Sequence, residues 1–173
     1  MRVVRLSISN FRGIKSAEIH FDGHTLLVGP NNVGKSTILE ALDLVLGPDR
    51  LSRFPPVEEF DFHNATYFLP PEQDGEEPRI VPIQIEAVVI DLNAELENRC
   101  GGHIEFWKPV DRRLLAEGKI AEANPPETVS CLRLVTIARY VPDEDEFEAQ
   151  TWFAHSPDAP DGELDATPIA LAA

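Results

Sequence analysis

The sequence has few cysteines and no long apolar run. Its two cysteines, Cys100 and Cys131, stand far apart without a CxxC spacing. This excludes a disulfide framework or a cysteine-rich zinc site, so a reducing, cytoplasmic environment is expected. No stretch of about 18 consecutive apolar residues occurs, which predicts that no segment spans a membrane. The N-terminus lacks the apolar core of a secretory signal.

Positive charge is scarce and unevenly placed. The chain holds 15 Lys and Arg against 30 Asp and Glu, for a formal net charge of -15. Up to Arg53 the balance is seven basic to five acidic residues, and beyond it eight to 25. A uniformly acidic protein repels nucleic acid. This split leaves a mildly basic N-terminal third, without positive evidence of a DNA groove, and the acidic remainder is interpreted as a solubilising surface.

The 173 residues, 43% of them hydrophobic, suffice for one domain with a buried core. Alternating apolar residues predict strands at Val4–Ile8 and Ala17–Phe21. The continuous run Leu26–Val28 is typical of a strand buried on both faces. From Ile38 to Leu46 apolar residues recur at helical spacing, and Gly47-Pro48 predicts the end of that helix.

Beyond residue 54 the pattern favours strands over helices. Strands are expected at Ile80–Asp91, Leu132–Tyr140 and Phe147–Ala154, the last two as a hairpin with the acidic tip Pro142–Glu146. The other expectations are a mobile loop at Phe68–Arg79, a short helix at Leu92–Arg99, a chain break at Asn124–Pro126 and a poorly ordered tail at 156–173.

Residues 29–36 fit the motif G-x-x-x-x-G-K-[ST], a P-loop. The two glycines let the backbone come close to phosphates, where a Cβ would clash. Successive N–H groups then form an anion nest, and the dipole of the following helix adds positive potential. The motif predicts phosphate binding by eight residues, namely Gly29, Asn31, Asn32, Val33, Gly34, Lys35, Ser36 and Thr37.

Within this motif the side chains have separate expected roles. Lys35 reaches the β- and γ-phosphates, the Ser36 hydroxyl binds magnesium, and Thr37 adds a contact to the α-phosphate. The expected cofactors are therefore ATP and Mg²⁺. A glycine turn with an incidental Lys-Ser is the alternative. The buried run before the motif and the amphipathic helix after it argue against that alternative.

A second pattern, Val88-Val89-Ile90-Asp91, resembles the apolar run and acid of a Walker B motif. Leu92 follows, where a catalytic Glu would be expected, and the run continues an alternating strand. The end of an ordinary strand is the favoured interpretation.

Two segments together resemble the N-termini of the RecF, SMC and OLD families of ABC-type ATPases. They are Leu6–Ile14, which contains Asn-Phe-Arg-Gly, and the P-loop at Gly29–Thr37. Later segments are most similar to the OLD family of ATP-dependent nucleases, at Glu59–Phe62, Ile83–Glu86 and Thr151–His155. The resemblance covers about residues 1–155.

The resemblance implies further site residues. Asn10 and Arg12 would lie beside the nucleotide, with Arg12 near its phosphates, whereas Phe11 is expected in the core. Asp61 would sense the γ-phosphate and magnesium, with His63 and Gln84 as rivals. The plain alternatives are a turn for Asn10 and solvent exposure for the others.

The resemblance also implies the fold. We expect an α/β P-loop NTPase of ABC/SMC type, with a mixed sheet around the P-loop helix and an antiparallel β-subdomain mainly at 80–154. Residues 1–155 would form the N-terminal lobe. No LSGG-type signature, complete Walker B motif, switch histidine or Toprim nuclease domain is recognisable. An incomplete ATPase head is therefore expected, which a second protomer or a C-terminal half would complete.

Three functions fit these observations. The first is the ATP-binding lobe of an OLD/RecF-like ATPase that processes DNA within a larger assembly and hydrolyses ATP poorly by itself. The second is a stand-alone, nucleotide-responsive binding module without catalysis. A small P-loop kinase is disfavoured, because the second half of the chain is acidic and lacks clustered arginines.

Overall fold

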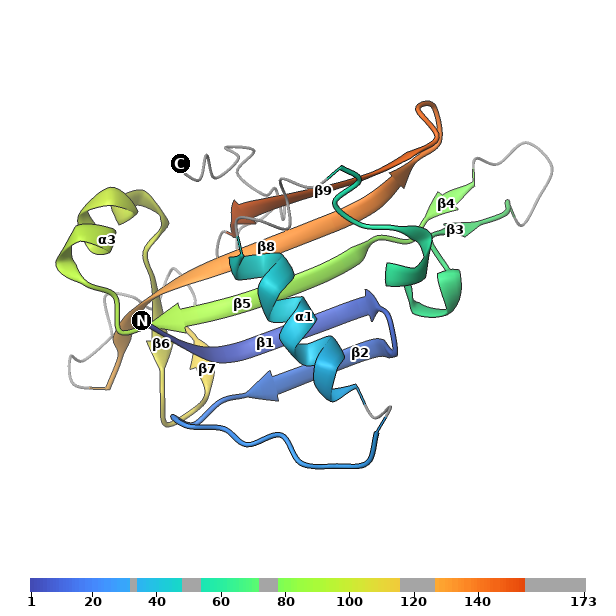
Figure 1. Cartoon of the computed structure of the whole chain (residues 1–173). Helices are drawn as coiled ribbons and strands as arrows, with labels where there is room; N and C mark the ends of the chain where they lie inside the picture. The colour runs from blue at the N-terminus through green and yellow to red at the C-terminus, as the bar shows by residue number, and fades with distance from the viewer. Residues whose placement is uncertain (32–33, 48–53, 72–77, 116–126, 155–173) are drawn as a thin grey trace.

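The computed structural model describes residues 1–31, 34–47, 54–71, 78–115 and 127–154. In these ranges a broad sheet dominates and one helix crosses its face (Figure 1). The elements in chain order are β1 (Arg2–Phe11), β2 (Ile14–His20), α1 (Lys35–Leu46), η1 (Glu59–Asp61), η2 (His63–Ala65), β3 (Phe68–Leu69), β4 (Arg79–Ile80), β5 (Ile83–Ile90), α3 (Ala94–Arg99), η3 (Gly101–His103), β6 (Glu105–Lys108), β7 (Arg113–Leu114), β8 (Val129–Val141) and β9 (Glu146–Phe153).

The main sheet has seven strands in the order β2-β1-β5-β8-β6-β7, and β9 also pairs with β8. All of these pairings are antiparallel. The parallel pairs of the expected mixed sheet are therefore not among the described strands. β3 and β4 form a separate two-stranded ribbon.

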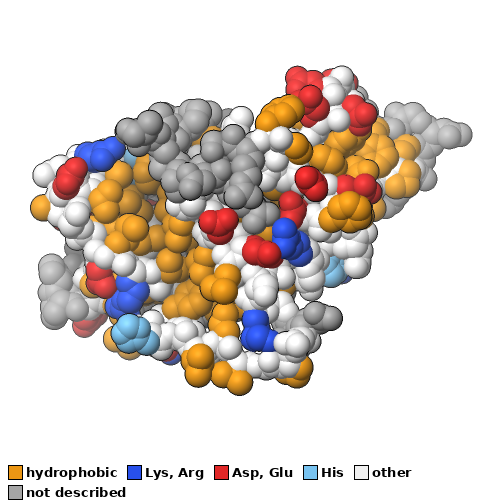
Figure 2. Space-filling model, in the orientation of Figure 1, with side chains coloured by type: hydrophobic (Ala, Val, Ile, Leu, Met, Phe, Trp, Pro, Cys, Tyr) orange, Lys and Arg blue, Asp and Glu red, His pale blue; other side chains and the backbone are white. Residues whose placement is uncertain are grey.

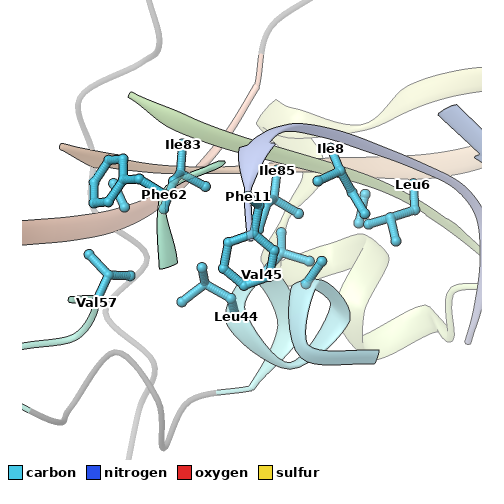
Figure 3. Close-up of a cluster of buried hydrophobic side chains, with 12 residues drawn as sticks. Leu6, Ile8, Phe11, Leu44, Val45, Val57, Phe62, Ile83 and Ile85 are labelled. Carbon is cyan, nitrogen blue, oxygen red and sulfur yellow. The ribbon is translucent and has the colours of Figure 1, made fainter. Parts of the chain in front are cut away.

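The main core lies between α1 and the sheet (Figure 3). Alternation in β1 and β5 turns every second side chain toward the helix, and the helical spacing of α1 turns its apolar residues toward the sheet. The residues buried there include Leu6, Ile8, Phe11, Ala41, Leu44, Val45, Val57, Phe62, Ile83, Ile85, Ala87 and Ala138. The predicted core position of Phe11 is confirmed by its 0% exposure.

A bulge in β1 directs one residue into a second cluster. The register of β1 against β5 shifts between Val3 and Arg5. A bulge inserts a residue and locally changes the direction of the side chains. Val4 consequently packs with Val88, Ile90, Trp107 and Cys131, apart from the core beneath α1.

Glycines bound the helix α1 on both sides. Gly34 precedes it with a φ of 88°, a left-handed conformation that favours glycine. At its end, a Cβ on Gly47 would lie 2.5 Å from the carbonyl oxygen of Asp43. The predicted helix and its end at Gly47 are therefore confirmed.

Several other expected elements are present. β1, β2, β5 and α3 lie where the sequence predicts them, and β8 and β9 form the expected hairpin around its acidic tip. The expected loop at Phe68–Arg79 instead begins and ends in paired strands, since Phe68 pairs with Ile80 and Leu69 with Arg79. The break at Asn124–Pro126 and the tail at 156–173 lie outside the described residues.

The predicted strand at Leu26–Val28 is wrong for this structure. Leu26 and Val28 are 84% and 82% exposed, and the segment has no strand structure. Figure 2 shows hydrophobic side chains along the lower edge of the molecule, where Figure 1 places the segment between β2 and α1. A three-residue run becomes a strand only when neighbouring strands satisfy its backbone hydrogen bonds, and no described strand pairs with it.

The longest helix among the described residues is α1, with 12 residues. None of the helices in this part of the chain is long and apolar enough to cross a membrane.

Candidate functional site

The P-loop leads directly into the N-terminus of α1. The amide of Ile38 donates to the carbonyl oxygen of Gly34, which closes the first turn of the helix. No side chain caps this end, and its first turn contains no acidic residue. The first amides of a helix lack partners within the helix and carry the positive end of its dipole. This end of α1 is therefore suited to an anion.

Lys35 lies at the first position of α1 and its side chain turns back over the loop. Its Nζ donates to the carbonyl oxygens of Gly29, at 2.7 Å, and Pro30. Two neutral carbonyls hold this ammonium group without neutralising its charge. Ser36 is exposed, whereas Thr37 is buried at 9% exposure. Asn31 is exposed, and Asn32 and Val33 lie outside the described residues.

The turn between β1 and β2 lies beside the P-loop. A Cβ built on Gly34 would meet the Ile14 side chain at 3.6 Å. The next residues back along this turn are Arg12 and Gly13, and Arg12 forms an ion pair with Glu40 in the second turn of α1. The structure thus brings the Asn-Phe-Arg-Gly segment against the helix that follows the P-loop.

Arg12 connects three elements through its guanidinium group. Its Nε donates to Oδ1 of Asp61 at 2.7 Å, and another of its nitrogens pairs with Glu40. Burial by itself lowers the pKa of Arg12, but the hydrogen bond and charge of Asp61, together with Glu40, outweigh it and raise that pKa above its ordinary value. Arg12 is therefore a permanent cation held between two carboxylates.

Asp61 is buried at 7% exposure and both of its oxygens have contacts. Oδ1 accepts from Arg12, and Oδ2 accepts from the backbone amide of Glu58 at 3.1 Å. The backbone amide of Arg12 also donates to the Asp61 carbonyl oxygen at 2.7 Å. Two residues predicted from the sequence, Arg12 and Asp61, thus lie together.

Three other predicted residues have different surroundings. Asn10 is buried, and its amide donates to the carbonyl oxygens of Thr66 and Val81. His63 contacts the Arg12 carbonyl oxygen through Nδ1 at 2.8 Å. Gln84 is exposed on β5, opposite Ser9 of β1. His63 is therefore close to the Arg12–Asp61 pair, and Asn10 joins β1 to the segments around β3 and β4.

Asp91 occupies an ordinary position at the end of β5. It has a φ of 58° and forms an exposed ion pair with Arg2, with 3.2 Å between Oδ2 and Nε. β5 lies between two antiparallel neighbours, β1 and β8. These features agree with the interpretation of this segment as the end of a strand.

A wide cavity of about 800 Å³ lies beside Arg12. Its lining residues are Arg12, Gly13, Pro55, Pro56, Val57, Glu58, Phe60, Asp61, Phe62, Asn64 and Ala65. Among the described residues no group of three or more His, Cys, Asp or Glu side chains could hold a metal ion.

Comparison with known proteins agrees with this geometry. The model of a family described as "AAA ATPase domain" matches residues 1–100. The chain belongs to this AAA ATPase domain family.

Among curated proteins, this AAA ATPase domain is 49% identical to an OLD nuclease of Thermus scotoductus over 43 residues, which are 25% of the chain and 8% of that protein. It is 49% identical to a DNA double-strand break repair Rad50 ATPase of Methanopyrus kandleri over 47 residues, 27% of the chain and 5% of that protein. It is 44% identical to the DNA replication and repair protein RecF of Leifsonia xyli over 55 residues, which are 30% of the chain and 14% of that protein. The matches thus span small parts of much longer relatives, and the region is an OLD/RecF-like ATPase region.

From the sequence, no role was expected for Glu40 or Glu58 in this AAA ATPase domain, and Phe60 entered only as part of the OLD-like segment Glu59–Phe62. Glu40 lies on the helix five residues after Lys35, where periodicity indicates only a polar face. Glu58 and Asp61 have the three-residue spacing of a capping box, and their side chains do form one around η1. That spacing is the signal in the sequence from which the role of Glu58 was predictable. Nothing in the sequence indicates that Phe60 stays exposed.

Proposed function

We propose that this chain is the ATP-binding lobe of an OLD/RecF-like ATPase that acts in DNA processing, either in repair or in phage defence. The observation that carries the proposal is the uncapped N-terminus of α1, with Lys35 beside it and no carboxylate in its first turn. Membership of an AAA ATPase family supports nucleotide as the anion. The similarity to an OLD nuclease, a Rad50 repair ATPase and RecF supports the DNA context.

In this proposal the P-loop amides and Lys35 bind the phosphates, and Arg12 approaches them from the β1–β2 turn. Binding exchanges the two carbonyl contacts of Lys35 for phosphate oxygens, which the ammonium group prefers because they are charged. Thr37 stays as a proposed contact to the α-phosphate, and Asn10 as a residue beside the nucleotide.

Nucleotides bound to AAA ATPases usually carry Mg²⁺, which adds positive charge to the phosphate oxygens. The exposed hydroxyl of Ser36 in the first turn of α1 fits this ion. Each Asp61 oxygen already accepts one hydrogen bond, from Arg12 or from the Glu58 amide, so Asp61 is less available to the ion than Ser36. We therefore assign the contact with Mg²⁺ to the Ser36 hydroxyl, and a role of Asp61 as a metal ligand stays a prediction.

Hydrolysis requires groups from elsewhere in the assembly. A second ATPase protomer, or a C-terminal half with the signature and Walker B motifs, would supply them, and endonuclease activity would lie in a Toprim part. The exposed Leu26 and Val28, directly before the P-loop, support contact with such a partner because single apolar side chains gain from burial. DNA would be engaged by the complete assembly.

The test is a binding titration of the wild-type chain and Lys35→Ala with Mg-ATP and Mg-GTP. We expect Lys35→Ala to weaken ATP binding by about tenfold or more, because a charge-assisted contact to phosphate is lost. Lys108→Ala, which removes a lysine on β6, is the matched control and should bind as the wild type does. Equal affinities of wild type and Lys35→Ala would refute the proposal.

Turnover provides a second measurement. The wild-type chain should bind ATP yet hydrolyse it slowly, since no group that orients the attacking water is proposed within it. Steady-state hydrolysis at the rate of a complete ATPase would contradict the proposed division of the site between partners.

A further inference from the structure

The cavity beside Arg12 has the size and lining of a small-molecule site. Its volume of about 800 Å³ falls within the range of about 300–1,000 Å³ that is usual for ligand pockets. Prolines, Val57 and two phenylalanines give it an apolar wall, and a few polar side chains interrupt that wall. Such a lining favours a ligand that is largely flat and apolar, with some hydrogen-bonding groups.

This cavity is connected with the P-loop through the β1–β2 turn. Arg12 and Gly13 line the cavity, while Ile14, the next residue, lies against Gly34. Arg12 also pairs with Glu40, which is about 7.5 Å along the helix axis from Lys35. Nothing lies within 4 Å of a Cβ built on Gly13. The surface of the turn is therefore open at Gly13, the residue between the one that lines the cavity and the one that lies against Gly34.

The charges in the two sites select different parts of such a molecule. Among the described residues that line the cavity, the charged side chains are Glu58, Asp61 and Arg12, and Arg12 is already paired with Asp61 and Glu40. Phosphate groups are repelled there. At the start of α1 the helix end and Lys35 attract them. A nucleotide satisfies both conditions when its uncharged base and ribose lie in the cavity.

Phe60 supplies a flat surface at the cavity. It lines the cavity and is 82% exposed, although the neighbouring Asp61 and Phe62 are buried. The capping box between Glu58 and Asp61 fixes the turn that carries it. An exposed aromatic ring at a polar rim is a surface on which a nucleobase stacks.

We infer that this cavity holds the base and ribose of the nucleotide whose phosphates bind at the start of α1, and that Phe60 stacks on the base. The inference rests on the proposed function, and it names the part of the chain that distinguishes a nucleoside triphosphate from a simple polyphosphate.

The test compares Mg-ATP with inorganic triphosphate, which lacks base and ribose. Binding of each ligand is titrated by calorimetry against the wild-type chain and Phe60→Ala. Phe60→Ala should weaken ATP binding by roughly five- to a hundredfold, the loss expected for one base–aromatic stack. It should leave the affinity for inorganic triphosphate unchanged. Phe54→Ala is the matched control, because Phe54 is 81% exposed and does not line the cavity.

Lys35→Ala separates the failure of this inference from that of the proposed function. If Lys35→Ala weakens both ligands while Phe60→Ala changes neither, the phosphate site stands and the base site is refuted. Equal weakening of both ligands by Phe60→Ala also refutes it. If Lys35→Ala changes neither ligand, or the wild-type chain binds neither, the proposed function fails and this inference with it. Circular dichroism confirms that each variant is folded, as expected for an exposed side chain.

Discussion

Asn10 combines an unusual backbone conformation with a buried side chain. Its φ is 57°, a left-handed value that asparagine tolerates better than most residues. Its Nδ2 donates to Thr66 O at 2.8 Å and to Val81 O at 3.1 Å. These bonds satisfy two carbonyls on segments far away in the sequence, so Asn10 has a structural role in this arrangement whether or not it also lies near a nucleotide.

Asn10→Ala should lower the free energy of unfolding by about 2–4 kcal/mol. The variant leaves two carbonyls without their donor and places a Cβ residue at positive φ without a local hydrogen bond. Asn10→Gly loses the same hydrogen bonds but tolerates the backbone, so it should be about 1 kcal/mol more stable than Asn10→Ala. Urea denaturation measures both. A loss below about 0.5 kcal/mol for Asn10→Ala would show that these bonds contribute little.

At the scale of elements, four charged side chains link four strands on the face of the sheet away from α1. Arg133 on β8 donates to Glu105 on β6, with 2.9 Å from Nε to Oε2, and lies 3.4 Å from Glu86 on β5. Glu86 also pairs with Arg5 on β1. The side chains of Arg133, Glu105 and Glu86 are 8%, 11% and 14% exposed. The charges balance, which is the condition under which buried ions are tolerated.

This network also surrounds Cys131. Burial raises the pKa of the Cys131 thiol to about 12, with a further contribution from the charge of Glu105. The thiol therefore stays protonated at neutral pH and packs as a small apolar group beside Trp107 and Val4.

Arg133→Met should destabilise the chain by about 3–5 kcal/mol, because it leaves the carboxylate of Glu105 buried without its partner. The double variant Arg133→Met/Glu105→Met removes both charges and should regain much of that loss, since Glu86 keeps its pair with Arg5. Chemical denaturation of the wild type, both single variants and the double variant completes the cycle. Additive losses would show that the two residues do not act as a pair.

At the scale of the whole molecule, the main core lies between α1 and the antiparallel sheet. Residues 26–28, which precede the P-loop, take no part in it. Leu6 and Ile8 are buried beneath α1, at 0% and 2% exposure, while Leu26 and Val28 face solvent. Apolar residues stabilise a fold only where they leave water. The stability of the 173-residue chain should therefore depend on β1 and not on residues 26–28.

The double variant Leu26→Ser/Val28→Ser should change the free energy of unfolding by less than about 0.5 kcal/mol, as for exposed substitutions elsewhere. Leu6→Ala, by comparison, should lose about 2–5 kcal/mol through a cavity in the core. Thermal and urea denaturation measure both. A large loss for Leu26→Ser/Val28→Ser would show that this segment is buried in the chain in solution, as the sequence pattern indicated.

The sequence by itself determined the features that depend on local order. Alternation located β1, β2, β5, β8 and β9, because the side-chain period of a strand is set by its own backbone. The spacing of glycines, Lys35 and Ser36 located the P-loop before α1, and the Asn-Phe-Arg-Gly segment indicated the family that comparison then showed.

Only the tertiary structure decided features that depend on distant partners. Leu26–Val28 has the composition of a buried strand, yet pairing requires neighbours that no local pattern reports. The ion pairs of Arg12 with Glu40 and Asp61 join residues 28 and 49 positions apart, and Asn10 binds carbonyls still farther along the chain. Such contacts arise when separate segments pack together, so the cavity beside Arg12 and the exposure of Phe60 followed from the fold and not from the order of residues.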